Sequence, residues 1–239
     1  MNSDASAKGA LRAALGNPDF VRIWMVGACG GTMRWLEVLA VSIYTLSLTG
    51  SALDVALMYF ARTGPTLLCA PIAGALAERV PRRVLLGAGF SIAALTSMVL
   101  AVLAHTGHLT LWQVAVGAVI SGIFWSLEHT VRRTIARDVV DPLSIGNAIS
   151  LDSSTQNATR MLGPLAGGTL YAMVGMPGAY SIGALFYATA VVLIVLMRQS
   201  LPPVRIGAES LLAGLVSVLR YIATERTVAG VLAITVCLN

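Results

Sequence analysis

A short charged turn between two long apolar segments constrains this chain more than any other feature of its sequence. Residues 74–86 read GALAERVPRRVLL, and the apolar segments around the turn end at Ala77 and begin again at Val84. Only six residues, 78–83, are left to reverse the direction of the chain. This arrangement predicts two membrane-spanning helices that meet as a hairpin. The three arginines of the turn place it on the cytoplasmic face, where loops are enriched in Lys and Arg.

The composition also indicates a membrane protein. Of the 239 residues, 56% are hydrophobic and only 11% are charged, a balance that is unusual for a soluble domain. The net charge is +5, but the cations lie in loops beside apolar segments, where they set topology and contact anionic lipid. We therefore expect the lipid bilayer as a partner and no nucleic acid.

The sequence contains no pattern typical of an enzyme. It has no nucleophile arrangement, no metal-ligand cluster and no phosphate-binding loop, so we expect no catalytic residues, no cofactor and no metal. The three cysteines, Cys29, Cys69 and Cys237, are scattered through apolar stretches and suggest neither a disulfide framework nor a zinc site.

Six apolar segments of spanning length predict an all-α, polytopic six-helix bundle with both ends in the cytoplasm. Asn17 and Pro18 make a good start for the first helix, because Asn caps helices and Pro suits the first helical position. The expected helices cover residues 20–48, 52–77, 84–105, 109–130, 143–174 and 178–197.

Three further segments flank the bundle, which we assign to residues 17–197. Residues 1–16 form a polar cytoplasmic arm. Residues 198–227 form a cytoplasmic linker with an amphipathic helix. Residues 228–239 begin an apolar segment that is too short to cross about 30 Å of hydrocarbon, so we interpret it as the start of a truncated seventh helix.

The turn at 74–86 resembles the loop between helices two and three in the major facilitator superfamily, which has the pattern G-x-L-a-D-r-x-G-R-R-x-x-l. Glu78 stands where the family has Asp, and Pro81 stands where it has Gly. The resemblance implies that Glu78 clamps the two halves of a carrier together on the inner side and that the arginines adjust this clamp. The matching positions are Gly74, Leu76, Arg79, Arg82, Arg83 and Leu86.

Two other stretches resemble the exporters of this superfamily. Residues 17–24 have the form N-x-D-F-x-R-x-W, which is similar to the start of the bacterial branch with enterobactin and macrolide efflux proteins. Residues 163–168, GPLAGG, resemble the G-P-x-x-G-G core of the motif in drug and proton antiporters, and they also suit close helix packing. The matching residues are Gly163, Pro164, Gly167 and Gly168.

The resemblance implies proton-coupled efflux of a small amphipathic molecule, drug-like or siderophore-like, across a bacterial-type cell membrane. Carriers of this superfamily have two six-helix halves with the substrate between them, and this chain resembles the first half and the linker. A C-terminal half or a second copy is therefore expected as a partner. The alternatives are a non-transporting scaffold or assembly subunit, and a nutrient importer of the same superfamily.

In the superfamily, helices one and four line the central cavity, which makes their polar and aromatic residues candidates for the substrate or proton pathway. Charges at this depth in a membrane need a partner or a wet cavity. Arg34 and Glu37 are three apart, so we expect them to pair, either facing the cavity or as a structural ion pair. Glu128 and Arg132 are four apart and predict an ion pair at the inner surface, or a substrate role. The candidates are Arg34, Trp35, Glu37, Arg62, Phe124, Trp125 and Glu128.

We predict that the loops at residues 49–53 and 105–109 lie outside the cell, because they contain no Lys or Arg. In a variant without native cysteines, Ser51→Cys and Gly107→Cys should react with an impermeant thiol reagent in intact cells. The control, Asp141→Cys, lies in an inner loop and should react only after the cells are opened. Labelling in the reverse order would overturn the topology.

Overall fold

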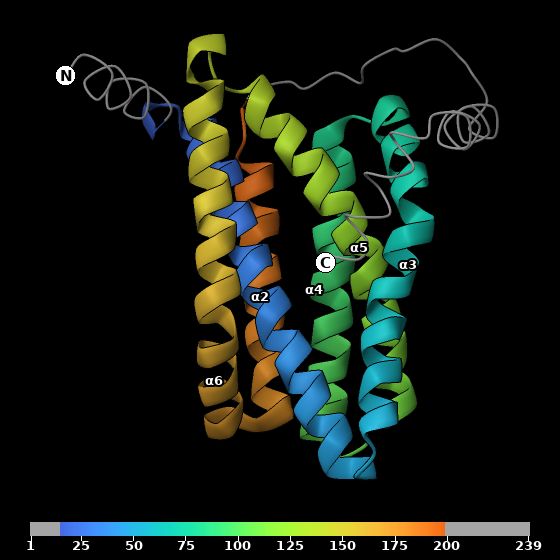
Figure 1. Cartoon of the computed structure of the whole chain (residues 1–239). Coiled ribbons are helices and arrows are strands. Elements are labelled where there is room, and N and C mark those ends of the chain that lie inside the picture. Colours follow the sequence, from blue (N-terminus) through green and yellow to red (C-terminus); the bar gives the residue numbers. More distant parts are fainter. Residues whose placement is uncertain (1–14, 199–239) are drawn as a thin grey trace, which may run out of the picture. The chain divides into compact units, whose positions relative to one another are not determined.

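The computed structural model describes residues 15–198, except for the side chains at 67–68, 70–75, 77–79 and 143. In this part of the chain, the regular structure is entirely helical (Figure 1). The seventh segment predicted from the sequence lies outside the described residues, as do the terminal arm except for residues 15–16 and the linker except for Arg198. The elements are α2 (Pro18–Thr49), α3 (Ala52–Arg79), α4 (Arg82–His105), α5 (Leu111–Asp138), the 3-10 helix η1 (Pro142–Ser144) and α6 (Ile145–Val195).

Element α6 contains two of the six predicted spans. Gly175 interrupts it with φ 62° and ψ −168°, a conformation that glycine adopts without the penalty a Cβ would bring. Figure 1 shows that the chain turns back here, so that 145–174 and 176–195 run side by side in opposite directions. The described residues therefore form the six-span, all-α bundle predicted from the sequence.

The start of α2 agrees with the prediction from Asn17 and Pro18. The Asn17 side chain accepts hydrogen bonds from the backbone N–H of Asp19 at 2.9 Å and of Phe20 at 3.3 Å. These bonds satisfy two donors that the first helical turn would otherwise leave without partners.

The end of the fourth span differs from the prediction. We expected the helix to stop near Thr130 because charged residues follow, but α5 continues to Asp138. The helix continues because Arg132 is fully buried among polar partners, and no helix-breaking residue occurs before Pro142. The charged residues that follow Thr130 therefore do not mark the end of α5.

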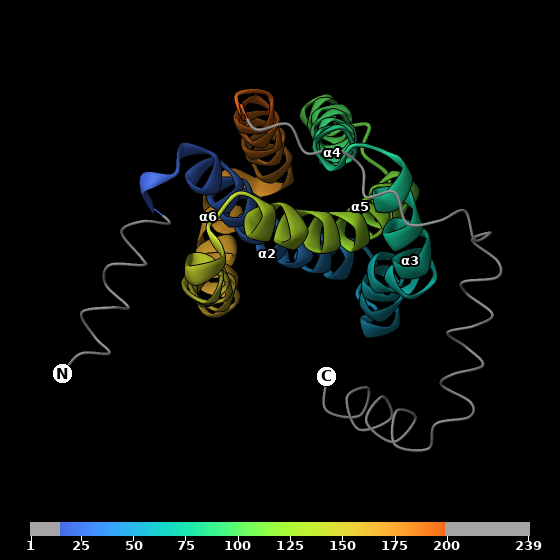
Figure 2. The same cartoon turned by 90° about the horizontal axis from the view of Figure 1, so that it is seen from above.

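The helices form two layers around a central pair. Figure 2 shows α2 and α5 in the middle, with α3 and the first half of α6 on one side and α4 and the second half of α6 on the other. Helix α2 packs mainly on α6, and α5 packs mainly on α3. An inverted repeat of three helices predicts this pairing, because it relates the first span to the fourth and the second to the fifth.

Glycines bring the paired helices into close contact. A Cβ on Gly163 would lie 2.6 Å from the Cβ of Trp35, and one on Gly122 would lie 1.9 Å from the carbonyl oxygen of Arg62. Gly167 similarly faces the backbone of Leu36. Small residues at such contacts allow backbones to approach, as expected for residues 163–168. Gly168 has open space around its Cα and takes no part in this packing.

The outer surface of the bundle is apolar. Phe60, Trp112, Met161 and Met173 each expose more than two thirds of their surface. Among the described residues, α4, α5 and α6 are long and apolar enough to cross a membrane by length and composition. The chain is therefore a multi-pass membrane protein.

We predict that Gly163→Ala lowers the stability of the chain in detergent by about 1–3 kcal/mol, because the new methyl group overlaps Trp35. Thermal unfolding followed by tryptophan fluorescence measures the change. Gly168→Ala in the same helix is the matched control and should be close to neutral. Equal melting temperatures for both variants would show that the contact at Gly163 is not tight.

Candidate functional site

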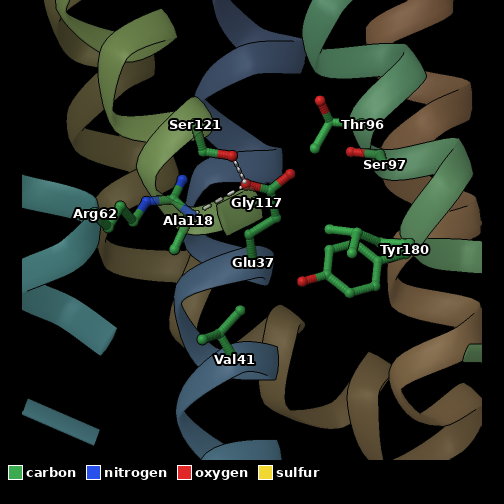
Figure 3. A pocket seen from close by; sticks show the side chains of 10 residues that line it. Glu37, Val41, Arg62, Thr96, Ser97, Gly117, Ala118, Ser121 and Tyr180 are labelled. Carbon is green, nitrogen blue, oxygen red and sulfur yellow. Dashed lines mark hydrogen bonds and ion pairs between the residues drawn. The ribbon is translucent and has the colours of Figure 1, made fainter. Parts of the chain in front are cut away.

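Glu37 is the centre of a polar cluster formed by four helical segments. Its Oε2 lies 3.0 Å from Nη1 of Arg62 on α3 and accepts a hydrogen bond from Ser121 on α5 at 3.3 Å (Figure 3). Its Oε1 accepts a hydrogen bond from the hydroxyl of Tyr187, in the second half of α6, at 2.9 Å. Glu37 is only 5% exposed. We call Glu37, Arg62, Ser121 and Tyr187 the Glu37 cluster.

The predicted Arg34–Glu37 pair is wrong, because Glu37 forms its ion pair with Arg62 instead. Side chains three residues apart on a helix share a face, but neither must point at the other when a third group is closer. Of the two ways to compensate a charge at this depth, a partner or a wet cavity, Arg62 has a partner, the carboxylate of Glu37. A buried carboxylate with a guanidinium and two hydroxyl donors has the partners that its charge requires.

A small cavity lies beside Glu37. Its volume of about 10 Å³ is roughly enough for one water molecule. Figure 3 shows Glu37 and the hydroxyl groups of Thr96, Ser97 and Tyr180 around this space. The rest of the lining comes from Val41, Arg62, Leu100, Gly117, Ala118 and Ser121. The polar side of the cavity can thus supply a water molecule with several partners.

A second ionic cluster lies closer to the end of the bundle where α2 begins and α5 ends. Arg132 donates hydrogen bonds to Glu128 on its own helix and to Asp152 in the first half of α6. Arg133 lies 3.8 Å from the other oxygen of Asp152. We call Glu128, Arg132 and Asp152 the Arg132 cluster. The predicted Glu128–Arg132 pair is confirmed.

This pair is enclosed by the helices of the bundle. Arg132 and Glu128 are 0% and 1% exposed. Gly27 on α2 makes the burial possible, since a Cβ there would lie 2.5 Å from Nη1 of Arg132. One oxygen of Glu128, Oε2, has no hydrogen-bond partner within the described residues. This cluster therefore holds three charges in the bundle interior, and Arg132 is the buried arginine that links α5 to α6.

Arg34 interacts with aromatic rings. Its Cζ lies 3.8 Å from the ring centroid of Trp125 and 5.7 Å from that of Trp35. The ring of His129, one turn further along α5, lies 6.1 Å from that of Trp125, centroid to centroid, and is tilted by 40°. A cation over an aromatic ring contributes about 0.5–2 kcal/mol. The structure thus brings three predicted site residues, Arg34, Trp35 and Trp125, together.

Phe124 is separate from this group. It is 6% exposed and packs edge-on against Phe90 at 4.8 Å and against Tyr187 at 6.0 Å. Consecutive residues of a helix point about 100° apart, so Phe124 and Trp125 belong to different faces of α5. The structure places Phe124 in the core of the bundle.

The charged turn is tighter than its sequence suggested, because only Val80 and Pro81 separate α3 from α4. Arg82 forms an ion pair with Asp138 at the end of α5. Arg83 donates to the carbonyl oxygens of Ile194, at 3.0 Å, and Val195 at the end of α6. The side chains of Glu78 and Arg79 are not among those that the structure describes, and the surroundings of Gly74 are not described either.

The candidate list missed four residues of these clusters. The spacing predicts Arg132 as the partner of Glu128, but nothing in the sequence shows that Asp152 meets them. Ser121 and Tyr187 occur in apolar stretches and carry no signal. In the described part of the chain, no group of three His, Cys, Asp or Glu residues is placed to hold a metal ion.

Comparison with known proteins identifies the family. A family model described as a transmembrane secretion effector, of the MFS type, matches residues 10–238. This chain belongs to the major facilitator superfamily.

Two curated relatives of this superfamily member have transporter names. It is 29% identical over 168 residues to the uncharacterized MFS-type transporter YfiS of Bacillus subtilis (strain 168), a match that covers 70% of this chain and 39% of that protein. It is 27% identical over 161 residues to the staphyloferrin A transporter of Staphylococcus aureus (strain NCTC 8325 / PS 47), covering 67% and 41%. The chain thus spans about two fifths of the length of each relative.

We predict that Arg132→Met destabilises this facilitator chain by about 3–5 kcal/mol, because Glu128 and Asp152 then remain buried without their shared cation. Thermal unfolding in detergent measures the loss. Arg133→Met is the control and should cost less than about 1 kcal/mol, since Arg133 is partly exposed and 3.8 Å from its acid.

The triple variant Arg132→Met, Glu128→Gln, Asp152→Asn removes all three charges together. It should recover much of the lost stability, because no uncompensated charge remains. Equal stability of Arg132→Met and the native chain would show that the cluster is hydrated in the membrane rather than dry.

Proposed function

We propose that this chain is the N-terminal half of a secondary active transporter that exports a small amphipathic molecule, drug-like or siderophore-like, in exchange for protons. The family supports transport, and the name of the staphyloferrin A transporter supports a siderophore-like substrate. The exporter-like stretches at residues 17–24 and 163–168 favour efflux. In this proposal the protein lies in the cell membrane with its N-terminus in the cytoplasm.

The position of Glu37 is the observation that supports proton coupling. Its carboxylate contacts α3, α5 and the second half of α6 at once, so its charge affects the packing of four segments. Protonation would remove the ion pair with Arg62 and leave that guanidinium without an acid. The gain or loss of one proton at Glu37 would thereby change the contacts between helices, and such a link is what proton coupling requires.

The substrate would contact the residues of α2 and α5 that face away from the core. Arg34, Trp35 and Trp125 form such a group, and a C-terminal half or a second copy would supply the opposite wall. The turn at 74–86 would act at the inner end, where Arg82 and Arg83 join the start of α4 to the ends of α5 and α6. Glu78 would contribute the clamp that the family loop implies.

Everted membrane vesicles test this function. In respiring vesicles that contain the full-length protein, a panel of amphipathic dyes, drugs and siderophores is added while a fluorescent dye reports the proton gradient. An exported compound should partly collapse the gradient, because export into the vesicle returns protons to the medium. Vesicles without the protein are the control.

We predict that Glu37→Gln abolishes proton-driven efflux but preserves energy-independent exchange of the same compound, because the amide keeps the size of the side chain and cannot carry the proton. Asp54→Asn, at the outer end of α3, is the matched control and should transport normally. Normal pH-dependent efflux by a folded Glu37→Gln protein would contradict a proton-carrying role.

The same experiment separates the alternatives. Movement of the compound from the vesicle interior to the medium would favour a nutrient importer, because the cytoplasmic face of an everted vesicle is outside. No movement of protons or compound with any member of the panel would favour a membrane scaffold.

A further inference from the structure

Arg34 holds a charge near the middle of a spanning helix. It lies sixteen residues after the start of α2 at Pro18 and fifteen residues before its end at Thr49. At 1.5 Å per residue, it is about 24 Å from the inner end of the helix. A guanidinium at this depth is expensive unless it meets an acid or a polar cavity.

The carboxylates near Arg34 are already bound to other arginines. Glu37 is paired with Arg62, whereas Glu128 and Asp152 are paired with Arg132. Among the described residues, no carboxylate lies within 4 Å of Arg34, whose close contacts are the rings of Trp125 and Trp35. Its charge is therefore stabilised by aromatic faces and lacks a direct anionic partner in this part of the chain.

The neighbouring cations make the surroundings of Arg34 more attractive to an anion. Arg62 on α3 and Arg160 in the first half of α6 are like charges near Arg34, and Glu128 on α5 is the carboxylate that acts in the opposite sense. The charge of Glu128 is largely compensated by Arg132. Three guanidinium groups thus act on one region, and each acid in that region already has a cation.

The neighbours also define the face on which Arg34 lies. The charged and aromatic groups named above belong, apart from Trp35 on the same helix, to α3, α5 and the first half of α6. Figure 2 shows α3 and the first half of α6 together on one side of the central pair α2 and α5. Arg34 therefore faces that side, away from the layer formed by α4 and the second half of α6.

The contact with Trp125 leaves the binding edge of the guanidinium available. With Cζ 3.8 Å from the ring centroid, the ring covers one face of the planar group. The N–H donors of a guanidinium point outward in its plane, so a group stacked by its face can still bind two oxygens at its edge. Stacking also fixes a long side chain and lowers the entropy lost on binding.

We propose that Arg34, supported by Trp125, binds an anionic oxygen group of the transported molecule, such as a carboxylate. This inference rests on the proposed transport function and adds a substrate class to it, since an amphipathic substrate would place its acid at Arg34 and its apolar part on the indole rings. Glu37 and its proton remain a separate site, because the ion-pair partner of Glu37 is Arg62 and not Arg34.

Matched probes test the proposal by binding alone. The full-length protein is placed in nanodiscs of phosphatidylcholine, and equilibrium dialysis measures binding of 2-naphthoate and of its neutral analogue 2-naphthamide. Empty nanodiscs correct for partition into lipid. We expect the native protein to prefer the carboxylate by at least about tenfold, as for hydrogen bonds between charged groups.

Arg34→Gln should remove this preference, and binding of the amide should change little. Arg34→Lys should keep part of the preference, because it retains the charge without the two-pronged geometry. Arg22→Gln is the matched control at the inner end of the same helix, where Arg22 pairs with Asp19, and it should behave like the native protein. Helicity and gel-filtration profiles confirm that each variant is folded.

An equal or absent response to the two probes in the native protein would overturn the proposal, as would an undiminished preference in Arg34→Gln. This outcome is distinguishable from failure of the proposed function. Transport without Arg34-dependent preference would reject only the anion site, whereas Arg34-dependent binding without transport of any compound would reject the exporter and retain the anion site.

Discussion

Compensation of buried charge is the constraint on which the rest of this bundle depends. A carboxylate or guanidinium in the membrane interior is costly unless a group of opposite charge or another polar or aromatic group compensates it. Glu37 meets Arg62 across α2 and α3, and Arg132 meets Asp152 across α5 and α6. These bonds join helices that apolar side chains alone would pack with little preference for one arrangement, since lipid is equally apolar.

The two ionic clusters follow the symmetry of the helices. Glu37 lies nineteen residues after the start of α2, and Glu128 lies seventeen residues after the start of α5. Because the two helices run in opposite directions, the acids occupy opposite halves of the bundle (Figure 1). Tyr187 of the Glu37 cluster also packs against the rings of Phe90 and Phe124. An inverted repeat accounts for acids at similar depths from the starts of two helices that run in opposite directions.

Most of the architecture could be predicted from the sequence, because helix length, apolar character and caps are local properties. Asn17 caps α2, Gly163 permits close packing, and Glu128 bonds Arg132 one turn away, as expected. The clusters could not be predicted, because they depend on contacts between residues up to 150 positions apart, such as Tyr187 and Glu37. Spacing along α2 suggested Arg34 as the partner of Glu37, but it could not show that α3 places Arg62 nearer.

The contact between Gly122 and Arg62 limits how the Glu37 ion pair can open. The carbonyl oxygen of Arg62 rests against the Cα of Gly122, where no side chain would fit, so the backbone of α3 is held against α5 at the residue that carries the guanidinium. The arginine can leave Glu37 by rotation about its own side-chain bonds while both helices stay in place. Such rotamer changes are fast, on the order of nanoseconds where the side chain has room, whereas helix displacements take microseconds or longer. Opening of the pair and movement of the bundle are thus separable events in time.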